Sequence, residues 1–114
     1  TLAQIYAAVQ RFGSNRIILA HWGGGIFFYA LLKKEGREAL KNVWFDTAAS
    51  PYLYQPQVYR HALSLVGPEK VLLGSDFPLL TPNRYLKEMD KAGLSEVDKA
   101  AVCGLSAAKV LNLT

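Results

Sequence analysis

Three titratable side chains lie at or just beyond the ends of short apolar runs in this sequence. His21 follows Ile17-Ile18-Leu19-Ala20, Asp46 follows Val43-Trp44-Phe45, and Asp76 follows Val71-Leu72-Leu73 after Gly74 and Ser75. Near-continuous apolar runs of this length are typical of strands buried on both faces of a parallel sheet. Because α/β folds gather their functional groups where parallel strands end, we expect these side chains to lie at one edge of a sheet.

His21 is followed by three consecutive glycines, Gly23 to Gly25. Glycines let the backbone turn tightly and approach a ligand closely, at an entropic cost that a purely structural loop would not need. We therefore interpret His21 as a functional group, whereas His61, in the middle of a predicted helix, is interpreted as structural. An alternative is that the glycines cradle a phosphate on their N–H groups. The segment lacks the spacing of the known phosphate-binding motifs.

Asp76 lies in the segment Gly74-Ser75-Asp76-Phe77-Pro78. A carboxylate at a buried strand end needs a cation, a proton or several hydrogen-bond donors to offset its desolvation, and aspartate is a common ligand of divalent metals. The alternative for Asp76 is that it closes the following turn. For Asp46 we keep two roles open, a local turn role and support of a metal ligand through a hydrogen bond.

Composition and charge limit the class of protein. The 114 residues are 51% hydrophobic and 19% charged, which predicts one packed domain over 1–114 with no internal boundary. Basic residues exceed acidic ones for a net charge of +4, but they share their segments with acids, so we expect solvated helix faces and no nucleic-acid partner. The uncharged run over 17–32 is shorter than the ~20 apolar residues of a membrane helix, and we expect no membrane partner.

Cys103 is the single cysteine of the sequence. It excludes an intramolecular disulfide and favours a reducing compartment, so we expect a cytoplasmic protein. Its apolar neighbours indicate a core residue and not a nucleophile.

Amphipathic helices are predicted before and between the apolar runs, over 2–9, 28–39 and 58–66, and Phe28, Leu32 and Ala39 mark the apolar face of the second. A further helix is predicted to open after Thr81, with Tyr85, Met89 and Ala92 on its inner face, and a last one after Ser95. The last helix is predicted to bury Val97, Ala101, Leu105, Ala108 and Leu111. The order of elements is that of a βα repeat with three parallel strands. Three such strands cannot close a barrel and leave apolar edges open, so we expect the chain to self-associate or to need the remainder of a larger α/β fold.

Four segments together resemble a known family: LAHWGGG at 19–25, VWFDTA at 43–48, GPEKVLLGSDFP at 67–78 and AAKVL at 107–111. They resemble the carboxyl-terminal part of the metal-dependent amidohydrolases, in the branch that contains aminocarboxymuconate semialdehyde decarboxylase. The resemblance implies that the chain forms the last three βα units, strands six to eight, of a (β/α)8 TIM barrel. It implies that Asp76 is a metal ligand that helps to orient a metal-bound water, and that His21 is an acid/base residue beside the metal. Ser106 departs from the family, in which asparagine is frequent at that position.

The resemblance implies a divalent metal, with zinc as the first choice, and a small-molecule substrate. The leading hypothesis is a metal-dependent hydrolase that uses a metal-activated water on a C–N, C–O or lactone-type bond. Non-oxidative decarboxylation at the same site is the close alternative, and a small phosphate-binding α/β module without catalysis is the alternative from another class. The paired histidines of the family's first strand and the histidine of its fifth strand have no counterpart in 1–114. We therefore expect the chain by itself to be inactive and to bind zinc weakly.

Overall fold

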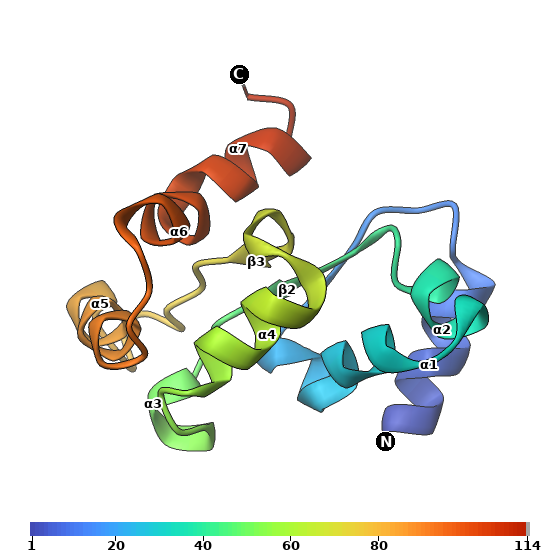
Figure 1. Cartoon of the computed structure of the whole chain (residues 1–114), viewed down its shortest axis with the longest axis horizontal. Helices are drawn as coiled ribbons and strands as arrows, with labels where there is room; N and C mark the ends of the chain where they lie inside the picture. Colours follow the sequence, from blue (N-terminus) through green and yellow to red (C-terminus); the bar gives the residue numbers. More distant parts are fainter. Residues whose placement is uncertain (114) are drawn as a thin grey trace.

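The computed structural model describes residues 1–113, in which a small parallel sheet is surrounded by short helices (Figure 1). The elements, in chain order, are α1 (Leu2–Arg11), β1 (Ile17–Leu19), the 3-10 segment η1 (His21–Leu31), α2 (Lys34–Ala39), β2 (Val43–Asp46), α3 (Ser50–Leu53), α4 (Val58–Val66), η2 (Pro68–Lys70), β3 (Val71–Leu72), α5 (Pro82–Lys91), α6 (Glu96–Ala100), the π-helical turn η3 (Ala101–Leu105) and α7 (Ser106–Val110). The predicted α/β class is therefore confirmed. No helix of residues 1–113 is both long enough and apolar enough to cross a membrane.

The sheet is parallel throughout and has the order β1-β2-β3. In its register Ile18 lies opposite Trp44, and Phe45 lies opposite Val71. Each strand falls where the sequence predicts one, and the parallel arrangement brings the segments that follow the three strands to the same edge. This edge carries the candidate site.

The two faces of the sheet are not equally covered. Val43, Phe45 and Val71 are buried, whereas Trp44 is only half-buried and Ile18 is 45% exposed. Since Ile18 and Trp44 are paired in the register, they share the less covered face. The expectation of strands buried on both faces is wrong for β1 and β2, whereas both residues of β3 are buried.

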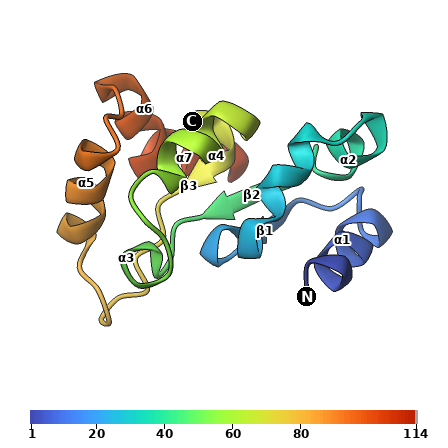
Figure 2. The same cartoon turned by 60° about the horizontal axis from the view of Figure 1, so that its bottom comes forward.

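The core lies between that covered face and the helices. Figures 1 and 2 show α1 and α2 at one end of the molecule and α5 and α6 at the other, with the strands between them. The largest fully buried side chains are Trp22, Tyr59, Tyr85, Phe45, Ile26 and Met89. Trp22 contacts Tyr59 edge-to-face, with ring centroids 5.2 Å apart. The segment after β1 and α4 are therefore in direct aromatic contact, and Tyr85 and Met89 of α5 belong to the same apolar cluster.

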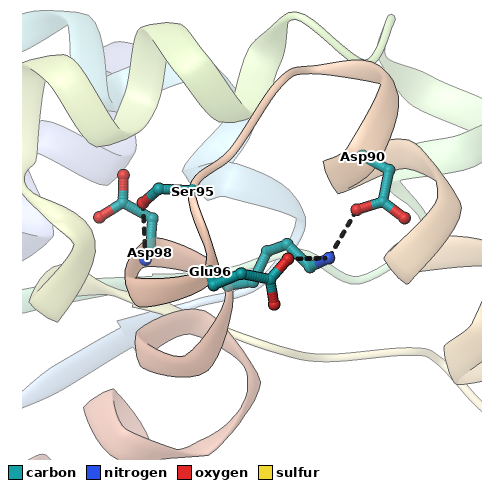
Figure 3. Close-up of polar contacts among 5 residues, drawn as sticks. Asp90, Ser95, Glu96 and Asp98 are labelled. Atoms are coloured by element: carbon teal, nitrogen blue, oxygen red, sulfur yellow. Dashed lines mark hydrogen bonds and ion pairs between the residues drawn. The ribbon is translucent and has the colours of Figure 1, made fainter.

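Helix starts follow the local signals in the sequence. Thr1 caps α1 reciprocally with Gln4, because the Thr1 hydroxyl accepts from the Gln4 N–H and the Gln4 side chain accepts from the amino terminus. Pro82 occupies the first turn of α5, as predicted. The Ser95 hydroxyl accepts a hydrogen bond from the N–H of Asp98 at 3.1 Å and so caps α6 (Figure 3).

The predicted helix over 28–39 is interrupted. The structure has the 3-10 segment η1 up to Leu31 and then α2 from Lys34, and Leu32 and Lys33 between them are extended. Phe28 and Leu32, which were expected on the buried face, are 54% and 50% exposed. The inner positions of η1 are instead occupied by Ile26 and Phe27, because the chain enters η1 through a left-handed turn that rotates the apolar face.

The predicted inner face of the last helix is wrong. Val97, Leu105 and Leu111 are exposed, whereas Val102, Ser106 and Val110 are buried. The predicted phase is wrong from the start of α6, because Val97 is 78% exposed before the π-helical turn η3 begins. Packing against β3 and η2 instead buries Val102, Ser106 and Val110, which are spaced four residues apart. Cys103 lies on the outer side of this turn and is exposed, which corrects its interpretation as a core residue. Ser106 donates a hydrogen bond to the Pro68 carbonyl at 2.8 Å, so this buried hydroxyl is satisfied.

Candidate active site

The segment that carries His21 is a left-handed turn. Residues 21–25 all have positive φ, from 54° at His21 to 95° at Gly25. L-residues avoid this conformation and glycine does not. A Cβ at Gly23 would also lie 2.8 Å from the side chain of Ile26. The turn itself therefore requires glycines, and this accounts for them without a bound phosphate.

The left-handed turn brings His21 onto the end of β2. The His21 N–H donates to Oδ1 of Asp46 at 3.1 Å, and Nδ1 of the ring lies 2.8 Å from the Ala48 carbonyl oxygen. Because a carbonyl can only accept, this contact places a proton on Nδ1 and leaves Nε2 as the basic nitrogen of the neutral ring. His21 is exposed, and Nε2 makes no hydrogen bond with residues 1–113. The structure thus presents an oriented imidazole with a free basic nitrogen.

The Asp46 carboxylate lies between the segments that follow β1 and β3. Its Oδ1 accepts from the N–H groups of both His21 and Ala48, the latter at 3.0 Å. On its other side it approaches Gly74 so closely that a Cβ there would lie 3.1 Å from the Asp46 carboxyl carbon. The Asp46 side chain therefore contacts both the His21 backbone and Gly74, which lies two residues before Asp76.

Asp76 lies in the exposed loop after β3, at φ 59°. Its carbonyl accepts from the N–H of Leu79 at 3.0 Å, which closes the turn through the backbone. Its carboxylate makes no hydrogen bond with the described part of the chain. The side-chain oxygens of Asp76 are thus available, at the same edge as the His21 ring.

We call residues 46–50, which follow the body of β2, the β2 loop. Two of its buried hydroxyls hold the neighbouring segments. The Thr47 hydroxyl donates to the Gly74 carbonyl at 2.9 Å and accepts from the Gly74 N–H at 3.1 Å. The Ser50 hydroxyl accepts from the Trp22 indole N–H at 2.5 Å and donates to the Thr47 carbonyl at 2.6 Å. The β2 loop therefore joins the segment of His21 to the segment of Asp76.

Tyr85, on α5, reaches the same place from the helical layer. Its hydroxyl donates to the Ser75 carbonyl at 2.7 Å and accepts from the Ala49 N–H at 2.9 Å. Burial, together with the charges of Asp76, Glu88 and Asp46, raises the pKa of Tyr85. The hydroxyl therefore keeps its proton at neutral pH and stays a donor to Ser75.

The residue pattern alone does not reveal the roles of Thr47, Ser50 and Tyr85. Thr47 and Ser50 stand in the segment Asp46-Thr47-Ala48-Ala49-Ser50, and two hydroxyls directly after a buried strand were a usable signal. Tyr85 was predicted as a core residue from its helical spacing, and it is fully buried. Its hydroxyl contacts could not be found in this way, because both partners are backbone groups of distant loops.

The donors at this edge fit part of a metal site. His21 Nε2 and the Asp76 carboxylate are chemically suitable ligands of a divalent metal and are free of hydrogen bonds to residues 1–113. Within those residues no group of three or more histidine, cysteine, aspartate or glutamate side chains could hold a metal. Catalytic zinc sites use three protein ligands, so further ligands would have to come from elsewhere.

The family model described as Amidohydrolase matches residues 1–113. The chain therefore belongs to the amidohydrolase family, as the sequence resemblance implied. The comparison with curated proteins found no match.

Solved structures share the fold. One is 5-carboxyvanillate decarboxylase from Sphingomonas paucimobilis, with a TM-score of 0.76 and 23% identity over 99% of this chain and 38% of that chain. A second is dihydroxybenzoic acid decarboxylase from a Polaromonas species, solved with manganese and the inhibitor 2-nitroresorcinol, with a TM-score of 0.77 and 15% identity over 98% of this chain and 40% of that chain. A third is an amidohydrolase from Burkholderia multivorans, solved with zinc, with a TM-score of 0.65 and 19% identity over 97% of this chain and 49% of that chain. The chain thus spans less than half the length of each of these structures.

Proposed function

We propose that this chain forms the last three βα units of a (β/α)8 barrel, strands six to eight, and supplies part of a metal-dependent active site. Three features support the proposal. The strands are parallel and alternate with helices. One face of the sheet, with Ile18 and Trp44, is less covered, as a face turned to a barrel interior would be in a partial barrel. The chain corresponds to 38–49% of the three solved relatives described above.

His21 is the proposed acid/base residue, and the contact of its Nδ1 with the Ala48 carbonyl carries the proposal. A histidine held in this way has a defined tautomer and ring orientation, which are what proton transfer at Nε2 requires. The backbone of His21 is also held, by Asp46. An exposed histidine with a purely structural role would not need its ring nitrogen fixed so that the other nitrogen stays free.

Asp76 is the proposed metal ligand, and its free carboxylate would hold the ion together with ligands from the rest of the barrel. When bound, a divalent metal would supply Lewis-acid polarisation of a substrate oxygen. Zinc and manganese are the ions to test first, because solved relatives contain them. Asp46 would act on the site indirectly, since its carboxylate fixes the His21 backbone.

Non-oxidative decarboxylation of a small aromatic carboxylic acid is the reaction that we propose. Two of the relatives described above are aromatic-acid decarboxylases. In such a reaction the bond between the ring carbon and the carboxylate breaks, carbon dioxide leaves, and the electron pair left on carbon takes up a proton. His21, protonated on both nitrogens, would deliver that proton from Nε2 and be reprotonated from solvent.

Hydrolysis is the second candidate, because a zinc-containing amidohydrolase shares the fold. In that case the carboxylate of Asp76 or Nε2 of His21 would accept the proton of the attacking water. The two reactions are separated by their products. We would incubate the complete protein with 5-carboxyvanillate and dihydroxybenzoates and measure released carbon dioxide, and with lactones and amides and measure released acid.

Variants of the complete protein test the two residue roles. His21→Ala is expected to retain the metal and to lower kcat by about 10²–10⁴-fold, the usual contribution of a general acid or base. Asp76→Asn is expected to lower both metal content and turnover, since a neutral amide offsets less of the cation's charge. Loss of metal in His21→Ala with none in Asp76→Asn would reverse the assignment. Unchanged turnover in both variants would contradict a role in catalysis and favour a binding module.

The open edge of β1 is the proposed contact with the rest of the barrel. Within residues 1–113, β1 pairs only with β2. A groove between α1 and this strand is lined by Ile5, Phe12, Ile17 and Ile18, and Phe12 is 49% exposed. We expect residues 1–114, expressed alone, to self-associate through this edge. Sedimentation showing a stable, well-folded monomer at micromolar concentration would contradict this expectation.

A further inference from the structure

We infer that Tyr85 is a positioning residue that sets the place of Asp76 relative to His21, an inference that rests on the roles proposed for those two residues. One hydroxyl group, from a helix, links the two loops that position the proposed site. It donates to the Ser75 carbonyl at 2.7 Å and accepts from the Ala49 N–H at 2.9 Å.

Each of these partners is one peptide away from the proposed site. Ser75 directly precedes Asp76 in the chain. Ala49 directly follows Ala48, whose carbonyl holds Nδ1 of His21. A displacement of the Tyr85 hydroxyl would therefore be transmitted to Asp76 through one peptide unit and to the His21 ring through another.

Thr47 already attaches the β3 end to the β2 loop, at Gly74. Beyond Gly74 the chain becomes exposed, and Asp76 has a positive φ of 59°. The Tyr85 bond to Ser75 is therefore the hydrogen bond from the helical layer that lies nearest to Asp76. Loss of this bond would free the Asp76 segment while the sheet remains held by Thr47.

The hydroxyl, and not only the ring, is needed for this role. The Tyr85 side chain is 0% exposed, so a phenylalanine would fill the same space. It would leave the Ser75 carbonyl and the Ala49 N–H without the partner that each has now. Backbone groups deprived of a partner in a water-poor environment move to find another one or remain at an energetic cost.

Tyr59 provides a matched control within the same core. It is also 0% exposed, and its hydroxyl makes no hydrogen bond with residues 1–113. Its ring packs edge-to-face on Trp22, next to His21. The Tyr59 hydroxyl faces the Thr47 and Ser50 side chains of the β2 loop but does not meet hydrogen-bond geometry with them. Tyr59→Phe therefore removes a buried tyrosine hydroxyl beside the same loop without removing a hydrogen bond to Ser75 or Ala49.

The experiment measures the affinity of the complete protein for zinc and for manganese by competition with a chelator. Tyr85→Phe is expected to weaken the affinity about 10–100-fold, the usual effect of losing a residue that orients a metal ligand. Tyr59→Phe is expected to leave the affinity within about twofold of the wild type. Equal affinities in wild type and Tyr85→Phe would overturn the inference, and so would an equal loss in both variants.

The double variant Tyr85→Phe/Asp76→Asn tests whether Tyr85 acts through Asp76. If it does, Tyr85→Phe causes no further loss of affinity once Asp76 is replaced. If the losses of metal affinity from the two substitutions add in full in the double variant, the inference is overturned. If Asp76→Asn alone leaves the affinity unchanged, the proposed metal role of Asp76 fails, and this outcome is distinct from additivity.

A rescue variant distinguishes the loss of the hydrogen bond in Tyr85→Phe from a folding defect. 4-Aminophenylalanine at position 85 keeps a donor at the place of the hydroxyl and can still bond to the Ser75 carbonyl. It is expected to recover at least tenfold of the affinity lost in Tyr85→Phe, with an unchanged circular dichroism spectrum. A correctly folded rescue variant with affinity as low as that of Tyr85→Phe would overturn the inference.

Discussion

Two polar regions of this molecule differ in the distance along the chain that their contacts span. At the β2 loop, the hydrogen bonds to other segments join residues 25 to 36 positions apart, as between His21 and Asp46 and between Ala49 and Tyr85. At the corner between α5 and α6, contacts join residues 3 to 9 positions apart, and Lys99 pairs there with Glu96 and Asp90 (Figure 3). The first region is mostly buried, and the acidic groups of the second are exposed.

The buried hydrogen bonds of the β2 loop and the exposed ion pairs of the corner contribute differently to stability. Exposed ion pairs gain little, because water and salt screen them and long side chains lose freedom. The formation of a buried hydrogen bond adds little net free energy to stability. Its loss is costly, since the remaining buried partner is left without a hydrogen bond. The β2 loop therefore determines where His21 and Asp76 lie, whereas the corner completes a local helix start. The following substitutions test this contrast, in order of decreasing effect.

The largest loss of stability is expected for Gly23→Ala. An alanine at this position must adopt a left-handed backbone conformation, which costs about 1–2 kcal/mol. Its Cβ would lie 2.8 Å from the Ile26 side chain and 3.1 Å from the Leu19 side chain. With about 1–3 kcal/mol for overpacking, the free energy of unfolding should fall by about 2–5 kcal/mol. Gly24→Ala is the control, because its φ is 66° but its nearest neighbours are 3.9 Å away. Urea unfolding of both variants checks this, and equal losses would exclude packing as the cause.

Thr47→Val is expected to rank second. Thr47 is 0% exposed, and the substitution removes both of its hydrogen bonds to Gly74 while preserving the volume of the side chain. Leaving a buried backbone group unsatisfied costs about 1–3 kcal/mol. Thr47→Ser keeps the hydroxyl and should lose less. A valine variant as stable as the serine variant would contradict the importance of the hydroxyl.

Glu88→Gln is expected to change the pH dependence of stability. Glu88 has a buried oxygen without a hydrogen-bond partner among residues 1–113, and burial raises its pKa, while Arg84 and Lys91 partly counteract this. The native state therefore binds a proton more tightly than the unfolded state. The stability that Glu88 contributes is full below its unfolded pKa and is lost as pH rises through its folded pKa. Unfolding midpoints from pH 4 upward should fall less in the glutamine variant, and parallel profiles would contradict this.

The smallest effect is expected for Lys99→Met. The variant loses both ion pairs of the corner, to Asp90 and to Glu96, but keeps most of the aliphatic stem. At physiological salt the unfolding midpoint should stay within experimental scatter, with a small decrease at low ionic strength. A loss as large as that of Thr47→Val would remove the contrast between the two regions.

The sequence predicts the parts of this protein that depend on neighbours along the chain. Three apolar runs predict the three strands, and Ser95 with Asp98 predicts the cap of α6, because a cap needs residues three positions apart. Parallel strands in succession predict a shared edge for His21, Asp46 and Asp76. The motifs around these residues also indicated the amidohydrolase family, which the family match confirms.

Packing between distant segments decided the rest. Packing against β3 and η2 set the buried face of the last helix at Val102, Ser106 and Val110, one position away from the face that the helical period from Val97 predicts. The contacts of His21 with Ala48 and of Tyr85 with Ser75 are made to backbone carbonyls. Every residue has such a group, so no residue type in the sequence marks the partner. Only the folded chain selects the carbonyl that lies within reach of each side chain.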